Sequence, residues 1–446
     1  MKKAACLSAA LMPVLLVIGA WLWFSLHHPL GNLLTSDPSG QALAWGRLAG
    51  LLAAVGVLLQ IMLIARVRRF EQVFGLDRLT RLHHVLGFSL VLLLVLHPAL
   101  VTVGHALQAD VGVVDQTVDF WKSWRGLSAA MAGFLMMLAA LATSALVLAK
   151  RMRYEAWYAT HLTLYVAFGL SFLHQVVTGS DLTDHPGFRV CWYLLYAYVL
   201  LHLIVCRFAK PCARYFRHRF KVERLVPEAG GVTSVHIGGR DLGALPAEAG
   251  QFVIVRFLAK GFRWEAHPFS LSSRPDGSSL RLSIKGVGDF TRRIPGLKPG
   301  TPVLLDGPYG VFTSRCCGSD QVLLVAGGIG ITPVRALAEE LVDEGRDVVL
   351  IYGNRNASGI VFKEELEALA ERSGGRLRLV HVLSGDSAWS GEKGHIDRDC
   401  LSRLVPDLAG RDVFLCGPAA MMKGVRRALA ALGVPDSRVH DERFAL

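Results

Sequence analysis

Six apolar segments, each long enough to cross a lipid bilayer, occupy the first 208 residues of this 446-residue chain. A hydrocarbon core of about 30 Å requires roughly 20 apolar residues in a helix. The segments lie near Ala5–Phe24, Ala42–Ala65, His83–His105, Gly126–Ala149, Glu155–Thr178 and Val190–Phe208. They predict a six-helix transmembrane domain over residues 1–210, followed by a soluble half.

The distribution of basic residues predicts how these helices are oriented. Fifteen lysine and arginine residues lie on one side of the arrangement, whereas Lys122, Arg125 and Arg189 lie on the other. Because basic loops stay in the cytoplasm, we expect both termini and the soluble half to be cytoplasmic. Bulky residues, including Trp21 and Trp23, end the first segment where a signal peptide would carry small ones, so we interpret it as an uncleaved helix.

Composition excludes two other classes of protein. The formal net charge is +12, but many basic residues cluster at the ends of apolar segments and form no stripe interleaved with aromatic residues. We therefore expect no nucleic-acid partner. The eight cysteines show no CxxC pair and no zinc-ligand spacing, which fits a reducing cytoplasm better than a disulfide framework.

Two pairs of histidines lie inside apolar segments: His83 with His97 in the third, and His161 with His174 in the fifth. An imidazole in hydrocarbon is costly unless it has a partner. The predicted topology places His83 and His161 near the inner face and His97 and His174 near the outer face. This arrangement is suited to two haems, one above the other, between two helices. His84 is an alternative inner ligand.

The two spacings fit a helix unequally. Fourteen residues separate His83 from His97, which gives about 21 Å of rise and side chains about 40° apart. Thirteen residues separate His161 from His174, which leaves the rings about 140° apart on an ideal helix. The fifth segment is therefore expected to contain a local distortion, unless the haems are offset sideways.

An arginine, Arg47, lies in the second apolar segment, one to two turns from its outer end. A guanidinium at that depth must be paired or face a cavity. A haem propionate would satisfy it, and the alternative is that the side chain reaches the outer interface.

Short β-patterned runs dominate residues 218–315 and predict a small β-barrel. They include Phe252–Phe257, Leu280–Ile284 and Pro302–Leu305. Within this region, HPFSLSS (267–273) combines a proline, an aromatic ring and hydroxyls that suit the edge of a flat ring. GVGDFT (286–291) places glycines and a hydroxyl at an expected helix start, where backbone N–H groups can bind a diphosphate.

Strands and helices alternate from residue 316 to 446, which predicts a doubly wound α/β nucleotide-binding domain. Expected strands are Val322–Ala326, Val348–Tyr352, Leu377–Leu383 and Val413–Cys416. GGIGITP (327–333) follows the first strand, and its glycine-rich turn leaves room for a pyrophosphate at the helix start. CGPAAM (416–421) opens the last helix, and Arg355 after the second strand favours a 2′-phosphate and hence NADPH over NADH.

The chain resembles the bacterial ferric reductase-like transmembrane proteins and NADPH oxidase homologues over nearly its whole length. The resemblance rests on the histidine spacings of fourteen and thirteen, HPFSLSS, GGIGITP and CGPAAM. It implies bis-histidine haem ligation, Ser270 beside the flavin, Cys416 near the nicotinamide and Arg47 near the outer haem. Phe444 is similar to the terminal aromatic residue that shields the flavin, although Ala445 and Leu446 follow it here.

The resemblance also implies the cofactor-binding residues of the soluble half. For FAD they are His267, Pro268, Phe269, Ser270, Ser273, Gly286, Gly288, Asp289, Phe290 and Thr291. For NAD(P)H they are Gly327, Gly328, Gly330, Thr332, Pro333, Arg355, Cys416, Gly417 and Pro418. The metal ligands are His83, His97, His161 and His174, and the residues expected to act in catalysis are Ser270, Cys416, Phe444 and Arg47.

The expected function is transmembrane electron transfer in the bacterial inner membrane, from cytoplasmic NAD(P)H through FAD and two b-type haems to an outer small-molecule acceptor. Dioxygen is the favoured acceptor, giving superoxide, although Val101 stands where some oxidases carry a further histidine. The alternatives are ferric-chelate reduction, a membrane-anchored flavin reductase with structural histidines, and a haem-binding membrane protein without NAD(P)H turnover.

Overall fold

The computed structural model describes residues 37–148, 151–152 and 154–442. The predicted first span, Ala5–Phe24, and Phe444 lie outside these residues. The chain divides into two compact units. The helical unit comprises Met1–Ala65 and Arg81–Ile204, and the β-rich unit comprises Arg66–Thr80 and Val205–Leu446.

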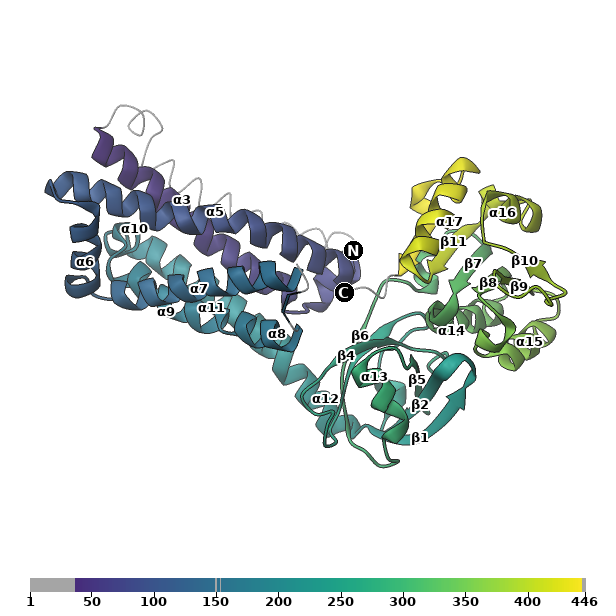
Figure 1. Cartoon of the computed structure of the whole chain (residues 1–446). Helices are drawn as coiled ribbons and strands as arrows, with labels where there is room; N and C mark the ends of the chain where they lie inside the picture. The colour runs from purple at the N-terminus through teal and green to yellow at the C-terminus, as the bar shows by residue number, and fades with distance from the viewer. Residues whose placement is uncertain (1–36, 149–150, 153, 443–446) are drawn as a thin grey trace. The chain divides into compact units, whose positions relative to one another are not determined.

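Long apolar helices make up the helical unit (Figure 1). Within the described residues, four helical runs are long and apolar enough to cross a membrane: Pro38–Ile64, Leu76–Ala109, Leu127–Leu146 and Pro186–His218. They correspond to the predicted second, third, fourth and sixth spans. The helix from Pro38 starts where Asp37 accepts a hydrogen bond from Gly40 N at 3.3 Å, which caps the free backbone donors.

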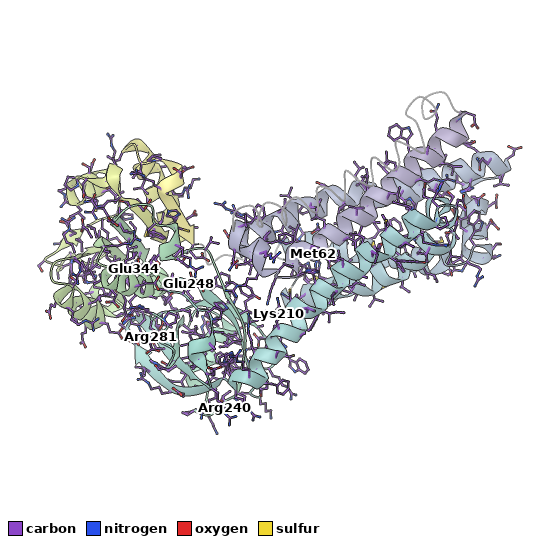
Figure 2. The ribbon with its side chains drawn as sticks, turned by 180° about the vertical axis from the view of Figure 1, so that it is seen from behind. Met62, Lys210, Arg240, Glu248, Arg281 and Glu344 are labelled. Atoms are coloured by element: carbon purple, nitrogen blue, oxygen red, sulfur yellow. The ribbon has the colours of Figure 1, made fainter. Side chains whose placement is uncertain are left out.

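The elements of the helical unit are α3 (Pro38–Ile64), α5 (Leu76–Ala109), α6 (Val113–Ser123), α7 (Leu127–Leu148), α8 (Tyr154–Leu162), α9 (Leu164–Val177), α10 (Ser180–Thr183) and α11 (Pro186–Ile204). Helix α7 packs along α9, and α11 packs on α3. Met62 is one of the buried α3 side chains (Figure 2). The predicted fifth span is present as two helices, α8 and α9, separated at Thr163.

Two antiparallel three-stranded sheets form the first part of the β-rich unit. One has the order β1 (Lys221–Glu228), β2 (Val232–Gly238), β5 (Leu280–Lys285). The other has the order β4 (His267–Ser270), β3 (Phe252–Phe257), β6 (Val303–Tyr309). Inward side chains of both sheets share one core, which includes Val235, Leu282, Val255 and Leu305. The three strands predicted in this region are confirmed as β3, β5 and β6, and β1, β2 and β4 are additional.

A six-stranded parallel sheet forms the second part, with the order β10-β9-β8-β7-β11-β12. Its strands are β7 (Gln321–Gly327), β8 (Asp347–Asn354), β9 (Leu377–Leu383), β10 (Glu392–Lys393), β11 (Asp412–Cys416) and β12 (Val439–Glu442). Helices α14 (Ile331–Asp343) and α15 (Lys363–Arg372) cover one face, and α16 (Arg398–Leu404) and α17 (Ala419–Ala431) cover the other. The doubly wound α/β prediction is confirmed.

The segment between the second and third spans belongs to the β-rich unit. It contains the short helix α4 (Arg68–Phe74). Arg66 forms an ion pair with Asp306, and Glu71 accepts a hydrogen bond from Gly310 N at 2.5 Å. Leu76, at the start of α5, packs against Phe252, Ile254 and Tyr309.

Glu71 makes the stability of this docked segment depend on pH. Its side chain is buried, and burial raises the pKa of the carboxyl to about 7 from an ordinary 4.5. The folded chain therefore holds this proton more tightly than the unfolded chain. The resulting stabilisation is fully present below pH 4.5 and is lost as the pH rises through about 7. The loss amounts to about 3 kcal/mol.

We expect Glu71→Gln to remove this loss, because a neutral amide cannot ionise on burial. Thermal unfolding of the purified protein in detergent should show the variant matching the wild type near pH 5 and exceeding it near pH 8. Glu371→Gln, at an exposed position, is the control. Equal wild-type and Glu71→Gln stability near pH 8 would contradict the prediction.

Candidate functional site

The helical unit brings the four predicted histidines together as two facing pairs. The ring centroids of His83 and His161 are 6.2 Å apart, and those of His97 and His174 are 6.1 Å apart. A metal bound between two imidazole nitrogens, at about 2 Å from each, places the ring centroids roughly 6 Å apart. Each pair therefore fits one metal ion with two axial imidazoles.

A break in the helix explains the spacing of thirteen. Helix α8 ends at Leu162 and α9 begins at Leu164, so the interruption falls between His161 and His174. The Thr163 hydroxyl donates to Thr160 O at 2.7 Å, and Thr163 N donates to the same carbonyl. The local distortion expected from the sequence is confirmed, and it lets both rings of the fifth segment face α5.

The inner pair uses His83 rather than its neighbour. His83 is half-buried and faces His161, whereas His84 is exposed. Trp157 packs against His161 with ring centroids 5.1 Å apart, and its Nε1 donates to Ser144 on α7 at 3.0 Å. Aromatic packing and this hydrogen bond to α7 therefore help to fix the His161 ring.

Arg47 is half-buried on α3 and makes no hydrogen bond or ion pair with any other described residue. It lies within electrostatic range of His105 on α5. Both interpretations of Arg47 given above, contact with a propionate and reach to the outer interface, stay predictions.

Two amide side chains in the membrane helices were missed from the sequence. Gln60 on α3 donates through Nε2 to His83 O at 2.9 Å, and its buried Oε1 has no partner. Gln175, next to His174, accepts from Trp192 Nε1 at 3.0 Å and from Tyr196 Oη at 2.9 Å. A polar amide inside an apolar segment was the signal that could have identified both.

The two predicted flavin motifs meet in the β-rich unit. Strand β4 contains HPFS, and GVGDFT leads into α13 (Asp289–Arg293). The Phe290 ring packs at a tilt against His267, with centroids 4.0 Å apart, and its centroid lies 6.4 Å from that of Phe269. The Thr291 hydroxyl accepts from Val287 N and Gly288 N at 3.0 and 2.8 Å, so this turn is shaped by its own side chain.

The serines of HPFSLSS have different roles in the structure. Ser270 is buried at the end of β4 opposite Phe252. Ser272 is fully buried and bonds to Ser283 at 2.8 Å, which makes it part of the core. Ser273 lines a separate cavity, described below.

The two predicted nicotinamide motifs also pack together, because β7 and β11 are adjacent parallel strands. A Cβ on Gly330 would lie 2.4 Å from Cys416 O, and one on Gly327 would lie 2.5 Å from Met421 Sδ. Glycine is required at both positions for this close approach. Cys416 is fully buried, opposite Glu442 of β12, and burial raises the pKa of its thiol.

Polar atoms without partners gather near the carboxyl ends of β8 and β9. They are Asn354 Nδ2, both ring nitrogens of His381 and Trp389 Nε1, and all are buried. Nearby, Arg355 is exposed, and among the described residues its guanidinium has no ion-pair partner. Buried polar groups in proteins nearly always have a partner, so these atoms indicate a bound ligand or water at this edge.

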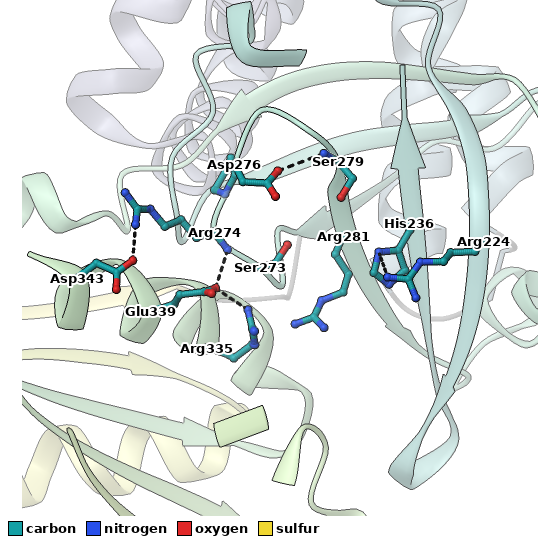
Figure 3. A pocket seen from close by; sticks show the side chains of 11 residues that line it. Arg224, His236, Ser273, Arg274, Asp276, Ser279, Arg281, Arg335, Glu339 and Asp343 are labelled. Carbon is teal, nitrogen blue, oxygen red and sulfur yellow. Dashed lines mark hydrogen bonds and ion pairs between the residues drawn. The ribbon is translucent and has the colours of Figure 1, made fainter. Parts of the chain in front are cut away.

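A separate cavity of about 590 Å³ lies in the same unit (Figure 3). It is lined by charged side chains that pair with one another: Arg274 with Asp343, and Arg335 with Glu339 at 2.8 Å. Arg281 of β5 reaches Glu365 of α15 at 2.8 Å. This network joins the antiparallel sheets to the α/β part, and Ser273 of HPFSLSS also lines the cavity.

Comparison with known families agrees with this organisation. The family model "Ferric reductase like transmembrane component" matches residues 49–172, "FAD-binding domain" matches 232–313, and "Oxidoreductase NAD-binding domain" matches 324–427. Together these three matches are those of a ferric reductase-like, NADPH oxidase-type family. They fit a ferric reductase-like transmembrane part followed by an FAD- and NAD-binding reductase part.

Among curated relatives, a flavohemoprotein from Candida albicans is 30% identical over 266 residues, or 56% of this chain and 66% of that protein. A glycine betaine monooxygenase reductase subunit from Pseudomonas aeruginosa is 31% identical over 210 residues, or 44% of this chain and 55% of that protein. The chain thus spans between about half and two thirds of these relatives.

Among solved structures, the flavohem-like FAD/NAD-binding domain of nitric oxide dioxygenase from Vibrio cholerae is 26% identical, with a TM-score of 0.46. The match covers 50% of this chain and 98% of that one.

Proposed function

We propose that this chain carries electrons across a bacterial inner membrane, from cytoplasmic NAD(P)H through FAD and two b-type haems to an acceptor on the outer side. The observation that carries the proposal is the pair of facing histidine pairs, with ring centroids 6.2 and 6.1 Å apart, in membrane-length helices. When bound, FAD and haem supply the redox chemistry, and the protein supplies binding and orientation.

In this proposal, each group of residues has one task. His83 with His161 binds the inner haem, and His97 with His174 binds the outer one. The β4 and α13 motifs hold the flavin, with Ser270 beside its reactive edge, and Phe444 shields it. The turns at Gly330 and Cys416 hold the nicotinamide.

The favoured acceptor is dioxygen, which gives superoxide. Arg47 supports this choice, because it offers a positive charge on the outer part of α3 that forms no ion pair with any other described residue. Ferric-chelate reduction is the alternative, and Val101 supports it by placing an aliphatic side chain where some oxidases carry a histidine.

An absorption spectrum of purified full-length protein, recorded before and after NADPH, tests the core of the proposal. We expect a haem Soret band that shifts on reduction. Protein without haem bands after haem supplementation contradicts the proposal and favours a flavin reductase with structural histidines. Haem bands that do not respond to NADPH favour a haem-binding protein without NAD(P)H turnover. Parallel assays of superoxide and ferric-chelate reduction separate the two acceptors.

Arg355 is expected to set the preference for NADPH. Replacing it by serine removes a charge-assisted contact to the 2′-phosphate, so KM for NADPH should rise about tenfold while KM for NADH stays unchanged. Steady-state kinetics with both nucleotides measure this effect. Arg372→Ser, at an exposed position at the end of α15, is the matched control. An equal change for both nucleotides would remove Arg355 from the binding site.

A further inference from the structure

Helix α3 places a backbone carbonyl opposite His83 and another opposite His97 of α5. Gly46 O lies 2.8 Å from His97 Nδ1, and Gln60 O lies 3.3 Å from His83 Nδ1. The two carbonyls are fourteen residues apart along α3, which is also the interval between the two histidines along α5. The two helices therefore keep their register from one histidine level to the other.

Such a contact decides which ring nitrogen is free. When Nδ1–H donates to a carbonyl, the lone pair remains on Nε2, which then binds the metal. The same hydrogen bond fixes the ring orientation and makes Nε2 more basic. A backbone carbonyl has two lone pairs, so it can accept from a histidine as well as from its own helix.

The other member of each pair has weaker support among the described residues. The Nδ1 atoms of His161 and His174 are buried and make no hydrogen bond of ordinary geometry there. Ser171, on the helix of His174 itself, is the nearest backbone acceptor to that ring. Within this part of the chain, hydrogen bonds from another helix therefore reach each pair from α3.

Glycines allow α3 to approach α5 closely at the outer level. A Cβ on Gly50 would lie 2.5 Å from His97 Nδ1, and one on Gly46 would lie 2.8 Å from Val101 Cγ2. Gly46 and Gly50 are about one turn apart and share a face of α3. Any larger residue at Gly50 must displace the His97 ring or separate the helices.

A side chain provides the second contact at the inner level. Gln60 Nε2 donates to His83 O at 2.9 Å, so this residue holds the α5 backbone as well as facing the ring. Gly87 leaves room for the amide, because a Cβ there would lie 3.1 Å from Gln60 Nε2. Gln60 is 9% exposed, so the contact is shielded from lipid and water.

We propose that α3 is the positioning helix for both metal levels. Gly46 and Gly50 orient His97, and Gln60 orients His83. This inference rests on the proposed function, because it requires the histidines to bind haem iron. It extends that function, because residues that do not touch the metal would set the tautomer and the basicity of one histidine ligand at each level.

Two variants test the two levels separately in the full-length protein. Gly50→Ala should lower haem affinity at the outer level about 10- to 100-fold, as is usual for loss of a supporting hydrogen bond, and raise the midpoint potential of any outer haem that stays bound. Gln60→Leu should shift the midpoint potential of the inner haem and leave that of the outer haem unchanged. Gly187→Ala, where a Cβ meets nothing within 4 Å, is the control.

Haem stoichiometry and a visible-light redox titration, which resolves two midpoint potentials, provide the measurements. Level-specific shifts in both variants support the proposal. The proposal is overturned if Gly50→Ala and Gln60→Leu both bind haem with the affinities and midpoint potentials of the control. That result would leave the proposed function intact. A wild-type protein without haem overturns the proposed function itself, and this is known before any variant is measured.

Discussion

His97→Leu is expected to remove the outer haem and to stop electron transfer across the membrane. Leucine has no nitrogen that could replace the imidazole as a ligand, and His174 would then be the one remaining histidine at this level among the described residues. Loss of a supporting residue around a metal typically costs 10- to 100-fold in affinity, so loss of a ligand should lower transfer to the outer acceptor by more than about 100-fold.

The haem content per chain and the rate of NADPH-driven reduction of an outer acceptor measure this effect. Haem content should fall by half, and reduction of a soluble dye that accepts electrons directly from the flavin should persist. His202→Leu is the control, because His202 on α11 bonds Tyr198 O at 2.9 Å and faces no partner histidine among the described residues. Two haems and full transmembrane transfer in His97→Leu would show that the ligand assignment is wrong.

A companion pair of variants decides between the two inner histidines that the sequence left open. His83→Leu should lose the inner haem, because His83 faces His161 with centroids 6.2 Å apart. His84→Leu should keep it, because His84 is exposed. The opposite result would move the inner ligand by one residue.

Sequence reasoning succeeded where the signal was local. The thirteen-residue interval between His161 and His174 could not place both rings on one face of an ideal helix. It therefore predicted a local distortion or sideways-offset haems, and the helix is interrupted at Thr163. The α/β half was predictable for the same reason: its buried strands are short apolar runs bounded by glycine turns. The strand Leu377–Leu383 was predicted at its observed bounds.

Sequence reasoning failed where the deciding contact is distant in the chain. From the sequence, the segment from Arg66 to Thr80 is expected to be only a basic connection between two spans. In the structure, Glu71 of this segment accepts a hydrogen bond from Gly310 N, and Arg66 pairs with Asp306. These partners are 239 and 240 residues away in the chain. No local pattern encodes such contacts. The raised pKa of Glu71 follows from the burial of its carboxyl, which outweighs the lowering effect of the hydrogen bond from Gly310 N.

The supporting residues of the site were missed for a related reason. Gly46 acts through its carbonyl, which every residue has, and only the packing of α3 on α5 brings that carbonyl to His97. Arg47, one residue later, attracted attention because a charge in a membrane segment is rare. Charge is visible in a sequence, whereas backbone hydrogen bonding to a side chain on another helix is not.

Gly330→Ala is expected to disable the use of NAD(P)H while leaving the membrane half intact. A Cβ at this position would lie 2.4 Å from Cys416 O and 2.8 Å from Gly417 Cα. Both neighbours are backbone atoms, so the β7 turn and the end of β11 must separate. Gly330 has an ordinary helical φ of −61°, so alanine changes the packing without backbone strain. A displacement of about 1 Å at a reacting centre can cost about 100-fold in rate.

Stopped-flow reduction of the flavin by NADPH measures this step directly. We expect a rate about 100-fold below wild type, with haem and flavin contents unchanged and with normal haem reduction when dithionite replaces NADPH. Gly424→Ala is the matched control, because a Cβ on that α17 residue meets nothing within 4 Å. A wild-type rate in Gly330→Ala would mean that the two motifs need not touch for hydride transfer. If Gly330→Ala lost haem as well as its rate of flavin reduction, the variant would have a folding defect, since nothing in the α/β part binds haem in this proposal.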